Sequence, residues 1–391
     1  MSASTEKKMR AKAKEEGTDK KANKAAEEAK KNEKTHKKYV ISIVAAVVLI
    51  AIILFLNSGL YYRSVTALKI GEEKFSTAEV NYEYAGQFYN FVSDYGSYAS
   101  YFGLDTTYGL STLGSQTCYL DENGGSWRDY FKTEAIGTLK QITGLCAYAN
   151  KNGISLDAQD YADIEAMFDD VEISAEAYGY KNGNQYLESV YGKGVNKNVI
   201  TAIEARRALA YKAYESMLED AAETDTEFTD YDMVNVRHIL IKAEASEDGS
   251  YTDDAKAAAK EKAEAVLAEY EAGAKTEESF AALAEAYSDD GGSNTNGGLY
   301  ENVYKNEMVA EFNDWCFDSS RKAGDTGIVF VDDEGYYVGY HIMYFSGLGD
   351  KYSTSDARKN ELATSLSDVI SELAETQTVK ATLFYNLVGK N

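Results

Sequence analysis

The sequence predicts an α+β protein: a small antiparallel sheet surrounded by helices, inserted in a mainly helical lobe and preceded by one transmembrane helix. Three observations support this fold class. The stretch 39–56 is an apolar run without a charged residue. Helical patterns lie on both sides of a central region of the chain. Within that region, runs rich in β-branched and aromatic residues surround His238 and His341.

The N-terminal part predicts a membrane anchor. Residues 1–38 are rich in Lys with interspersed Glu, so we expect a disordered basic tail. Residues 39–60 are long enough for a slightly short transmembrane helix. The lysine excess before this run places the tail in the cytoplasm and the main domains outside a bacterial cytoplasmic membrane, as a single-pass protein. A cleaved signal peptide is the alternative, but the run is long and no Ala-x-Ala site follows closely.

Charge and cysteine content exclude several classes of protein. The formal net charge is −24 despite the basic tail, which favours solubility or a mild attraction for cationic unfolded chains. Membrane topology explains the lysines of the tail, so we expect no nucleic-acid partner. Three cysteines do not make a disulfide framework in a chain of 391 residues, although Cys118 and Cys146 could pair. The chain contains no proline, for which the sequence offers no reason.

The lobe is expected to contain residues 61–232. Ser76 and Glu79 form a capping box before the first helix, and Ser126 caps the second. Residues 348–391 contain another helix and an apolar end, and are too short to fold alone. We therefore expect them to pack on the N-terminal helices, which makes 233–347 an inserted domain. The further helices are predicted at 157–170, 198–220 and 355–374, with a linker at 221–231.

The two histidine strands suggest a site. Side chains alternate between the faces of a strand, so His238 shares a face with Val236 and Leu240, and His341 with Gly339 and Met343. Both imidazoles should point at apolar surroundings, and they would face each other if the strands are neighbours. Burial should keep both rings neutral at physiological pH. The intervening chain predicts helices at 252–273 and 276–288, a glycine-rich loop at 288–298 and a short helix around 308–312.

Residues 235–346 carry the ordered motifs RHIL, FAALAEAYSDD, GG, MVAEF, GDTG and GYHI, and in this order they resemble the parvulin-type peptidyl-prolyl isomerases. The resemblance implies a cis-trans isomerase of X-Pro bonds that uses no cofactor and no metal. His238 and His341 match the paired histidines of the family, and Asp290 lies where a polar group near the rotating carbonyl is expected. Met308 and Phe312 match residues that hold the proline ring, and we expect them one helical turn apart.

The overall plan is similar to that of the membrane-anchored PrsA/SurA-type extracytoplasmic foldases. This resemblance implies a chaperone lobe that binds unfolded or newly exported polypeptides containing X-Pro bonds. Clustered tyrosines could line a client cleft, although we favour ordinary core and rim packing as their explanation. They are Tyr82, Tyr84, Tyr89, Tyr95, Tyr98 and Tyr101. The sequence leaves a homodimer open.

Some residues depart from the family pattern. Tyr300 stands where an aliphatic wall is expected, and Val338 lies where the family often places a hydroxyl group. Glu244, Glu247 and Asp248 follow the first strand, where phosphate-directed parvulins carry cations, so we expect no selectivity for phosphorylated substrates.

Three alternatives remain at this stage. A parvulin-fold holdase would bind clients with little or no isomerase activity. A structural tether would do neither. A metal site from His238, His341 and Asp290 is the third, while Cys316 fits a buried small residue.

Overall fold

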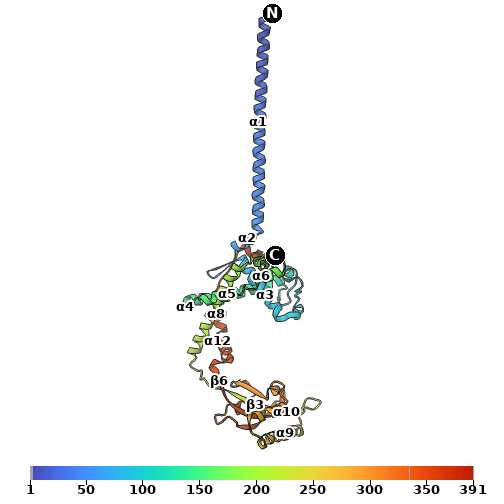
Figure 1. The fold of residues 1–391 in the computed structure, drawn as a ribbon, viewed down its shortest axis with the longest axis vertical. Coiled ribbons are helices and arrows are strands. Elements are labelled where there is room, and N and C mark those ends of the chain that lie inside the picture. Colours follow the sequence, from blue (N-terminus) through green and yellow to red (C-terminus); the bar gives the residue numbers. More distant parts are fainter. Residues whose placement is uncertain (1–2, 334, 391) are drawn as a thin grey trace. The chain divides into compact units, whose positions relative to one another are not determined.

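The computed structural model describes residues 3–333 and 335–390 (Figure 1). It has two compact units: unit 1 contains Met1–Glu215 and Asp368–Asn391, and unit 2 contains Ser216–Ser367. Unit 2 therefore interrupts unit 1 along the sequence, which confirms the predicted insertion of a sheet domain in a mainly helical lobe. Unit 2 extends beyond the expected boundaries 233–347, because it includes the end of helix α8 (Lys197–Thr224) and the start of helix α12 (Asp356–Glu375).

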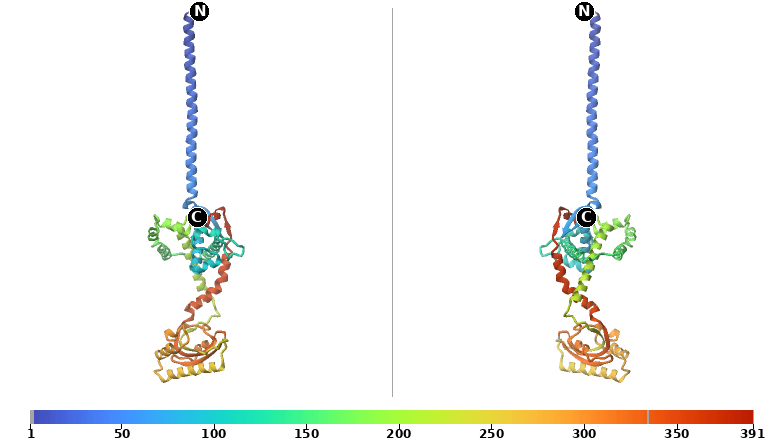
Figure 2. Two further views of the ribbon diagram at one scale, coloured as in Figure 1. Left: turned by 90° about the vertical axis from the view of Figure 1, so that its right-hand side faces the viewer. Right: turned by 90° about the vertical axis from the view of Figure 1, so that its left-hand side faces the viewer.

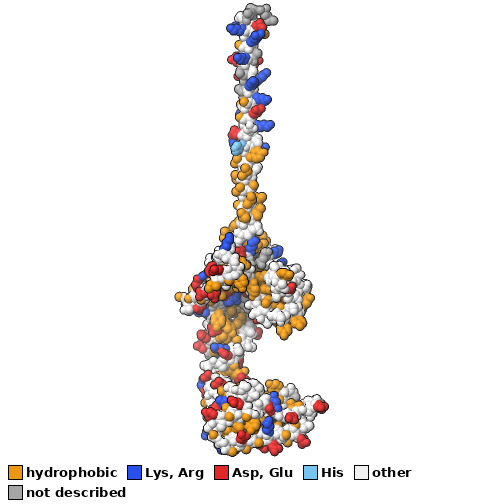
Figure 3. All heavy atoms as spheres, turned by 45° about the vertical axis from the view of Figure 1, so that its right-hand side comes forward, with side chains coloured by type: hydrophobic (Ala, Val, Ile, Leu, Met, Phe, Trp, Pro, Cys, Tyr) orange, Lys and Arg blue, Asp and Glu red, His pale blue; other side chains and the backbone are white. Residues whose placement is uncertain are grey.

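Helix α1 runs from Ala3 to Leu56 and includes most of the stretch 1–38, for which the sequence predicts a disordered tail. Ala, Glu and Lys all have high helix propensity, and ion pairs one turn apart join Glu6 to Arg10 and Glu33 to Lys37. Figure 3 shows the charged side chains on one half of the helix and a hydrophobic band on the other. By length and composition this helix could cross a membrane, and a signal sequence meets the same criteria.

Unit 1 contains a small sheet that the sequence did not predict. Strand β1 (Thr66–Ile70) lies between β2 (Glu73–Ser76) and β7 (Val379–Ala381), and both pairs are antiparallel. The C-terminal segment therefore returns to the lobe as expected, but as a strand followed by the 3-10 helix η5 (Leu383–Leu387).

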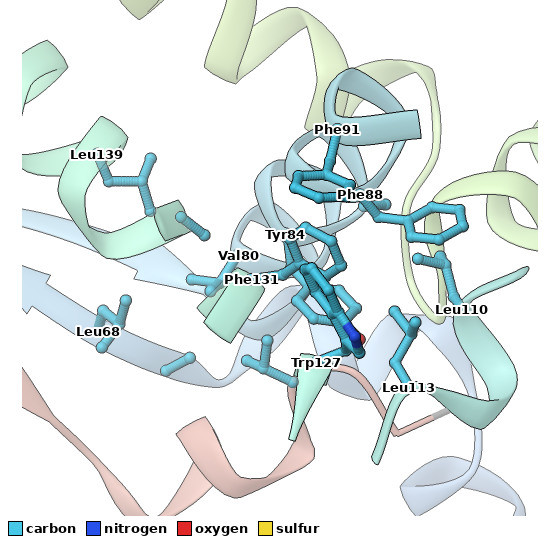
Figure 4. Packing of buried hydrophobic residues seen from close by; sticks show 14 of the residues in the cluster. Leu68, Val80, Tyr84, Phe88, Phe91, Leu110, Leu113, Trp127, Phe131 and Leu139 are labelled. Carbon is cyan, nitrogen blue, oxygen red and sulfur yellow. The ribbon is translucent and has the colours of Figure 1, made fainter. Parts of the chain in front are cut away.

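Helices α3 (Thr77–Tyr95) and α4 (Trp127–Asn152) form the centre of unit 1. The predicted capping box of Ser76 and Glu79 is confirmed, and the Ser126 side chain caps α4 by accepting from the Asp129 amide. Buried aromatic rings from both helices pack together, as Figure 4 shows for Tyr84, Phe131 and their neighbours. The other elements of the lobe are α2 (Gly59–Ser64), η1 (Gly96–Phe102), η2 (Gly109–Ser115), α5 (Ala158–Ala166), α6 (Val171–Ala177) and α7 (Gly183–Tyr191).

Cys118, Cys146 and Cys316 are buried free thiols, so the pairing of Cys118 with Cys146 that the sequence left open is not formed.

Unit 2 is built on a four-stranded antiparallel sheet of order β4-β3-β6-β5. One face packs on helices α9 and α10 through Ile239, Phe280 and Ile342. Figure 2 shows α9 running along one side of this sheet. The opposite face holds Val236 and Met343 against helix α11. The bounds are β3 (Asp232–Lys242), α9 (Asp253–Ala272), α10 (Glu277–Tyr287), η3 (Asn294–Asn296), β4 (Leu299–Val303), α11 (Ala310–Cys316), β5 (Thr326–Asp333), β6 (Tyr337–Lys351) and η4 (Tyr352–Thr354).

Candidate active site

The register of β3 and β6 brings the two histidines together. Leu240 lies opposite His341 and His238 lies opposite Met343, so the imidazoles are diagonal neighbours on one face of the sheet. Their Nδ1 atoms are 2.8 Å apart, and the rings stack with centroids 5.0 Å apart. Each histidine is only 4% exposed. The pair is therefore almost fully removed from water, and its ring nitrogens have hydrogen-bond partners within the protein.

Asp290 follows α10 and reaches the outer nitrogen of the first imidazole. Its Oδ2 is 2.9 Å from His238 Nε2. The segment that carries Asp290 is fixed to β3, because the Asp289 amide donates to the Leu240 carbonyl and the Leu240 amide donates to Ser288 Oγ. The hydrogen bonds from His238, Ser293 and the Gly292 amide hold the pKa of the Asp290 carboxyl well below its usual value. The carboxylate is therefore ionised at any physiological pH.

Two hydroxyl groups complete the surroundings of this carboxylate. Ser293 is 1% exposed, and its Oγ donates to Asp290 Oδ2 and lies 3.2 Å from His238 Nε2. Tyr300 Oη donates to the same carboxylate oxygen over 3.1 Å. Tyr300 therefore lies at the site, as its sequence position suggested. It lines the cavity and also donates a hydrogen bond to Asp290.

Tyr337 binds the outer nitrogen of the second imidazole, with its Oη 2.7 Å from His341 Nε2. Burial raises the pKa of Tyr337 to about 12, so the phenol keeps its proton and donates. Burial and the neighbouring His238 lower the pKa of His341 from 6.5 to about 3, which agrees with the expected neutral ring.

These contacts fix one order of donors when both rings are neutral. Tyr337 donates to His341 Nε2, so the proton of His341 lies on Nδ1 and is donated to His238 Nδ1. The proton of His238 then lies on Nε2 and is donated to Asp290. Every ring nitrogen of the two histidines then has a partner, and the donors point toward the negative charge of Asp290.

Next to this network lies a cavity of about 320 Å³, within the size range of small-ligand sites. Phe312 is 2% exposed and lies nearly perpendicular to both imidazoles, at centroid distances of 5.5 Å. Met308 is half-buried beside it. The cavity is lined by His238, Leu240, Lys242, Asp290, Tyr300, Glu307, Met308, Val309, Phe312, Tyr336, Tyr337 and His341. The structure thus places all six predicted site residues around one cavity.

The helix expected around 308–312 begins later than predicted. Val309 occupies the N-cap position of α11 with an extended ψ of 150°, so Met308 lies before the helix. It follows the turn formed by Tyr304 to Glu307, in which Asn306 adopts a positive φ of 65°. Met308 and Phe312 are therefore not one helical turn apart within a helix, although both line the cavity.

The glycine-rich loop is held against β3 by hydrogen bonds to Arg237 and His238. Arg237 donates to the carbonyls of Asn296 and Gly297 and forms an ion pair with Glu277. The His238 amide donates to the Gly298 carbonyl. Gly298 has a φ of +70°, and a Cβ there would lie 2.2 Å from the His238 carbonyl oxygen. Only glycine fits this close approach without displacing His238.

Sequence reasoning missed Tyr337 and Ser293. Tyr337 could have been found, since it lies four residues before His341 in one strand and thus on the same face. Ser293 lies in a loop without periodicity, so nothing in the pattern singles it out. Among the residues that the structure describes, no group of three or more His, Cys, Asp or Glu side chains has the arrangement of a metal site.

Comparison with known proteins identifies the family of the domain that carries this site. Residues 222–344 match the family model described as PPIC-type PPIASE domain. They therefore form a parvulin-type peptidyl-prolyl isomerase domain. A search of the curated proteins finds no match.

Several solved structures are similar over most of their length. A peptidylprolyl isomerase (PrsA) from Bacillus cereus is 18% identical, with 66% of this chain and 88% of that chain covered and a TM-score of 0.31. For the same protein from Bacillus anthracis the identity is 18%, the covered shares are 61% and 94%, and the TM-score is 0.24. The foldase protein PrsA from Streptococcus pneumoniae is 18% identical, with 65% of this chain and 86% of that chain covered and a TM-score of 0.27.

Proposed function

We propose that this protein catalyses cis-trans isomerisation of X-Pro bonds in unfolded polypeptides. The observation that carries the proposal is the cavity in which a buried, hydrogen-bonded histidine pair and an ionised Asp290 lie beside Met308 and Phe312. The match of residues 222–344 to the isomerase domain family supports the same activity.

The apolar half of the cavity suits the proline ring and the twisted bond. Rotation about an X-Pro bond meets a barrier of roughly 18–20 kcal/mol because amide resonance keeps the bond planar. The planar amide is more polar than the twisted one, so transfer from water into the pocket of Met308 and Phe312 favours the twist. A proline ring held there leaves the preceding carbonyl free to rotate, without nucleophile or metal.

The polar half would act on the rotating carbonyl. A planar amide concentrates negative charge on its oxygen, and twisting returns electron density to nitrogen. The Asp290 carboxylate at the cavity repels the oxygen most strongly in the planar state, and this lowers the barrier by destabilising the ground state relative to the transition state. The roles of the histidines are to hold Asp290 in place through His238 Nε2 and to give the floor a fixed shape.

A protease-coupled assay on a short Ala-Pro peptide tests this proposal. We expect activity in the full chain, and a loss in kcat/KM of about tenfold or more in both His238→Ala and Met308→Ala. His36→Ala, which removes the exposed histidine of α1, is the matched control and should retain full activity. An inactive wild-type chain that still suppresses aggregation of an unfolded protein would identify a holdase instead.

We further propose that unit 1 holds unfolded client chains outside the cytoplasmic membrane, with α1 as the anchor. The apolar half of α1 and the lysine excess before it support this location. The exposed tyrosines of the lobe support the binding role, since Tyr98 and Tyr101 are 66% and 78% exposed. Tyr84, in contrast, is a core residue, so the tyrosine cluster divides between packing and surface.

A further inference from the structure

Unit 1 contains a small aromatic cavity that the isomerase site does not involve. It lies between α3 and α4 and measures about 180 Å³, below the usual range for whole ligands, so it is suited to one side chain. Its walls are Phe91, Tyr95, Tyr130 and Phe131. The rings contact one another, with centroids 4.5 Å apart for Phe91 and Tyr95 and 5.5 Å apart for Tyr130 and Phe131. Figure 4 shows Phe91 and Phe131 among the packed rings of this region, and their centroids are 5.9 Å apart.

Two carboxylates, Asp94 and Glu134, belong to the same cavity. Neither has a hydrogen-bond or ion-pair partner among the residues that the structure describes, and both are exposed. Burial raises the pKa of Tyr130, and the nearby charge of Glu134 raises it further. No Lys or Arg occurs in the sequence between Lys74 and Arg128, so the α3 side of the cavity has no cation near it in the chain.

Helix stability does not account for Asp94. It occupies the last turn of α3, where the helix dipole is negative and an acidic side chain is unfavourable. The C-terminal carbonyls of α3 add to the negative potential of the cavity. This placement makes sense if a cation from outside occupies the space.

Another, larger cavity of the lobe differs in this respect. Its carboxylates, Glu83 and Glu204, already form ion pairs with Arg207 at 2.9 Å and 3.2 Å. In that cavity one arginine already pairs with both carboxylates, whereas Asp94 and Glu134 have no such partner among the residues that the structure describes.

We propose that the cavity formed by Phe91, Tyr95, Tyr130, Phe131, Asp94 and Glu134 binds an arginine or lysine side chain of an unfolded polypeptide. Aromatic faces attract a cation through their quadrupole, and the two carboxylates supply the opposite charge. The stacked rings of Tyr98 and Tyr101 follow directly after α3 and offer apolar surface to the rest of the client. This inference rests on the proposed client-binding role of unit 1 and adds the chemistry that is recognised.

Fluorescence anisotropy on the full chain in mild detergent tests the site. The probes are two short labelled peptides without proline, identical except that one contains arginine and the other citrulline, which has the same shape without the charge. We expect the arginine peptide to bind about tenfold more tightly than the citrulline peptide. The double variant Asp94→Asn, Glu134→Gln should abolish this difference, and Tyr95→Leu should reduce it.

The matched control is Asp169→Asn, Glu176→Gln, which removes two exposed carboxylates of the same lobe and changes the net charge equally. It should leave the preference for arginine unchanged. Equal binding of both peptides to the wild-type chain would contradict cation binding in the cavity. So would a control variant that loses the preference for arginine as fully as the Asp94→Asn, Glu134→Gln variant does. Both results leave the client-binding role of unit 1 intact. Binding of neither peptide overturns both. The X-Pro assay is independent of all these results, because the probes contain no proline.

Discussion

At the scale of residues, the site is defined by where protons lie. The order Tyr337, His341, His238, Asp290 runs from a neutral phenol to an ionised carboxylate, and each hydrogen bond fixes the tautomer of the next ring. The histidines themselves could be predicted, because strand alternation puts both on an apolar face. Tyr337, which orders them, belongs to none of the quoted motifs, and only its position on the same strand face as His341 could have indicated it.

Burial of His341 has a consequence for stability. Its pKa is about 3 in the folded chain and near 6.5 when unfolded, so the unfolded state binds more protons as the pH falls. Stability of unit 2 should be constant above neutral pH and decrease below it, by about 1.4 kcal/mol per pH unit between roughly pH 6 and pH 4.5. Asp290 remains ionised in both states over this window, since its pKa is lowered by folding from 3.8.

Urea unfolding at a series of pH values measures this effect. The two tryptophans, Trp127 in unit 1 and Trp315 in unit 2, give one fluorine NMR signal per unit after fluorotryptophan labelling. The Trp315 transition should show the pH dependence in the wild-type chain, and His341→Gln should flatten it. A Trp315 transition with the same slope in His341→Gln would assign the dependence to other groups.

At the scale of elements, predictability follows the range of the interactions. Helices with strong caps, such as α3 and α4, were identified from local sequence. The sheet of unit 1 was missed because β2 and β7 have four and three residues, and β7 pairs with β1 from the other end of the chain. The start of α11 was placed too early, since a positive φ at Asn306 and an extended Val309 override the apolar spacing of Met308 and Phe312.

The contact of the glycine-rich loop with β3 gives a prediction at this scale. Gly298→Ala should destabilise unit 2 by about 1–3 kcal/mol, because the new Cβ strains a positive φ and collides with the His238 carbonyl. The measurement is the urea midpoint of the Trp315 fluorine signal.

Gly291→Ala is the matched control in the same loop, where a Cβ meets nothing within 4 Å. Its effect should stay within about 0.5 kcal/mol. Equal stabilities of the two variants would show that the loop moves away from β3 without cost.

At the scale of the whole molecule, the order of the chain matters most. The fold class was predictable because the C-terminal residues are too few to fold alone and had to join the lobe. Removing residues 378–391 should lower the urea midpoint of the Trp127 signal, since it deletes β7 and the fully buried Val388. The Trp315 signal should keep its midpoint.

Leu383→Ser serves as the control for this truncation, because Leu383 is 73% exposed and lies in the same segment. It should leave both midpoints unchanged. A truncated chain with an unaltered Trp127 transition would mean that β7 contributes nothing to the lobe.

The pairing of β1 with β7 also imposes a sequence of events during biosynthesis. Thr66–Ile70 is synthesised before unit 2 and Val379–Ala381 after it, so the three-stranded sheet can form only when all of unit 2 has been made. Unit 2 is one uninterrupted segment and can finish folding while unit 1 is still incomplete. The parvulin-type domain can therefore be folded before the sheet of the lobe that it interrupts has formed.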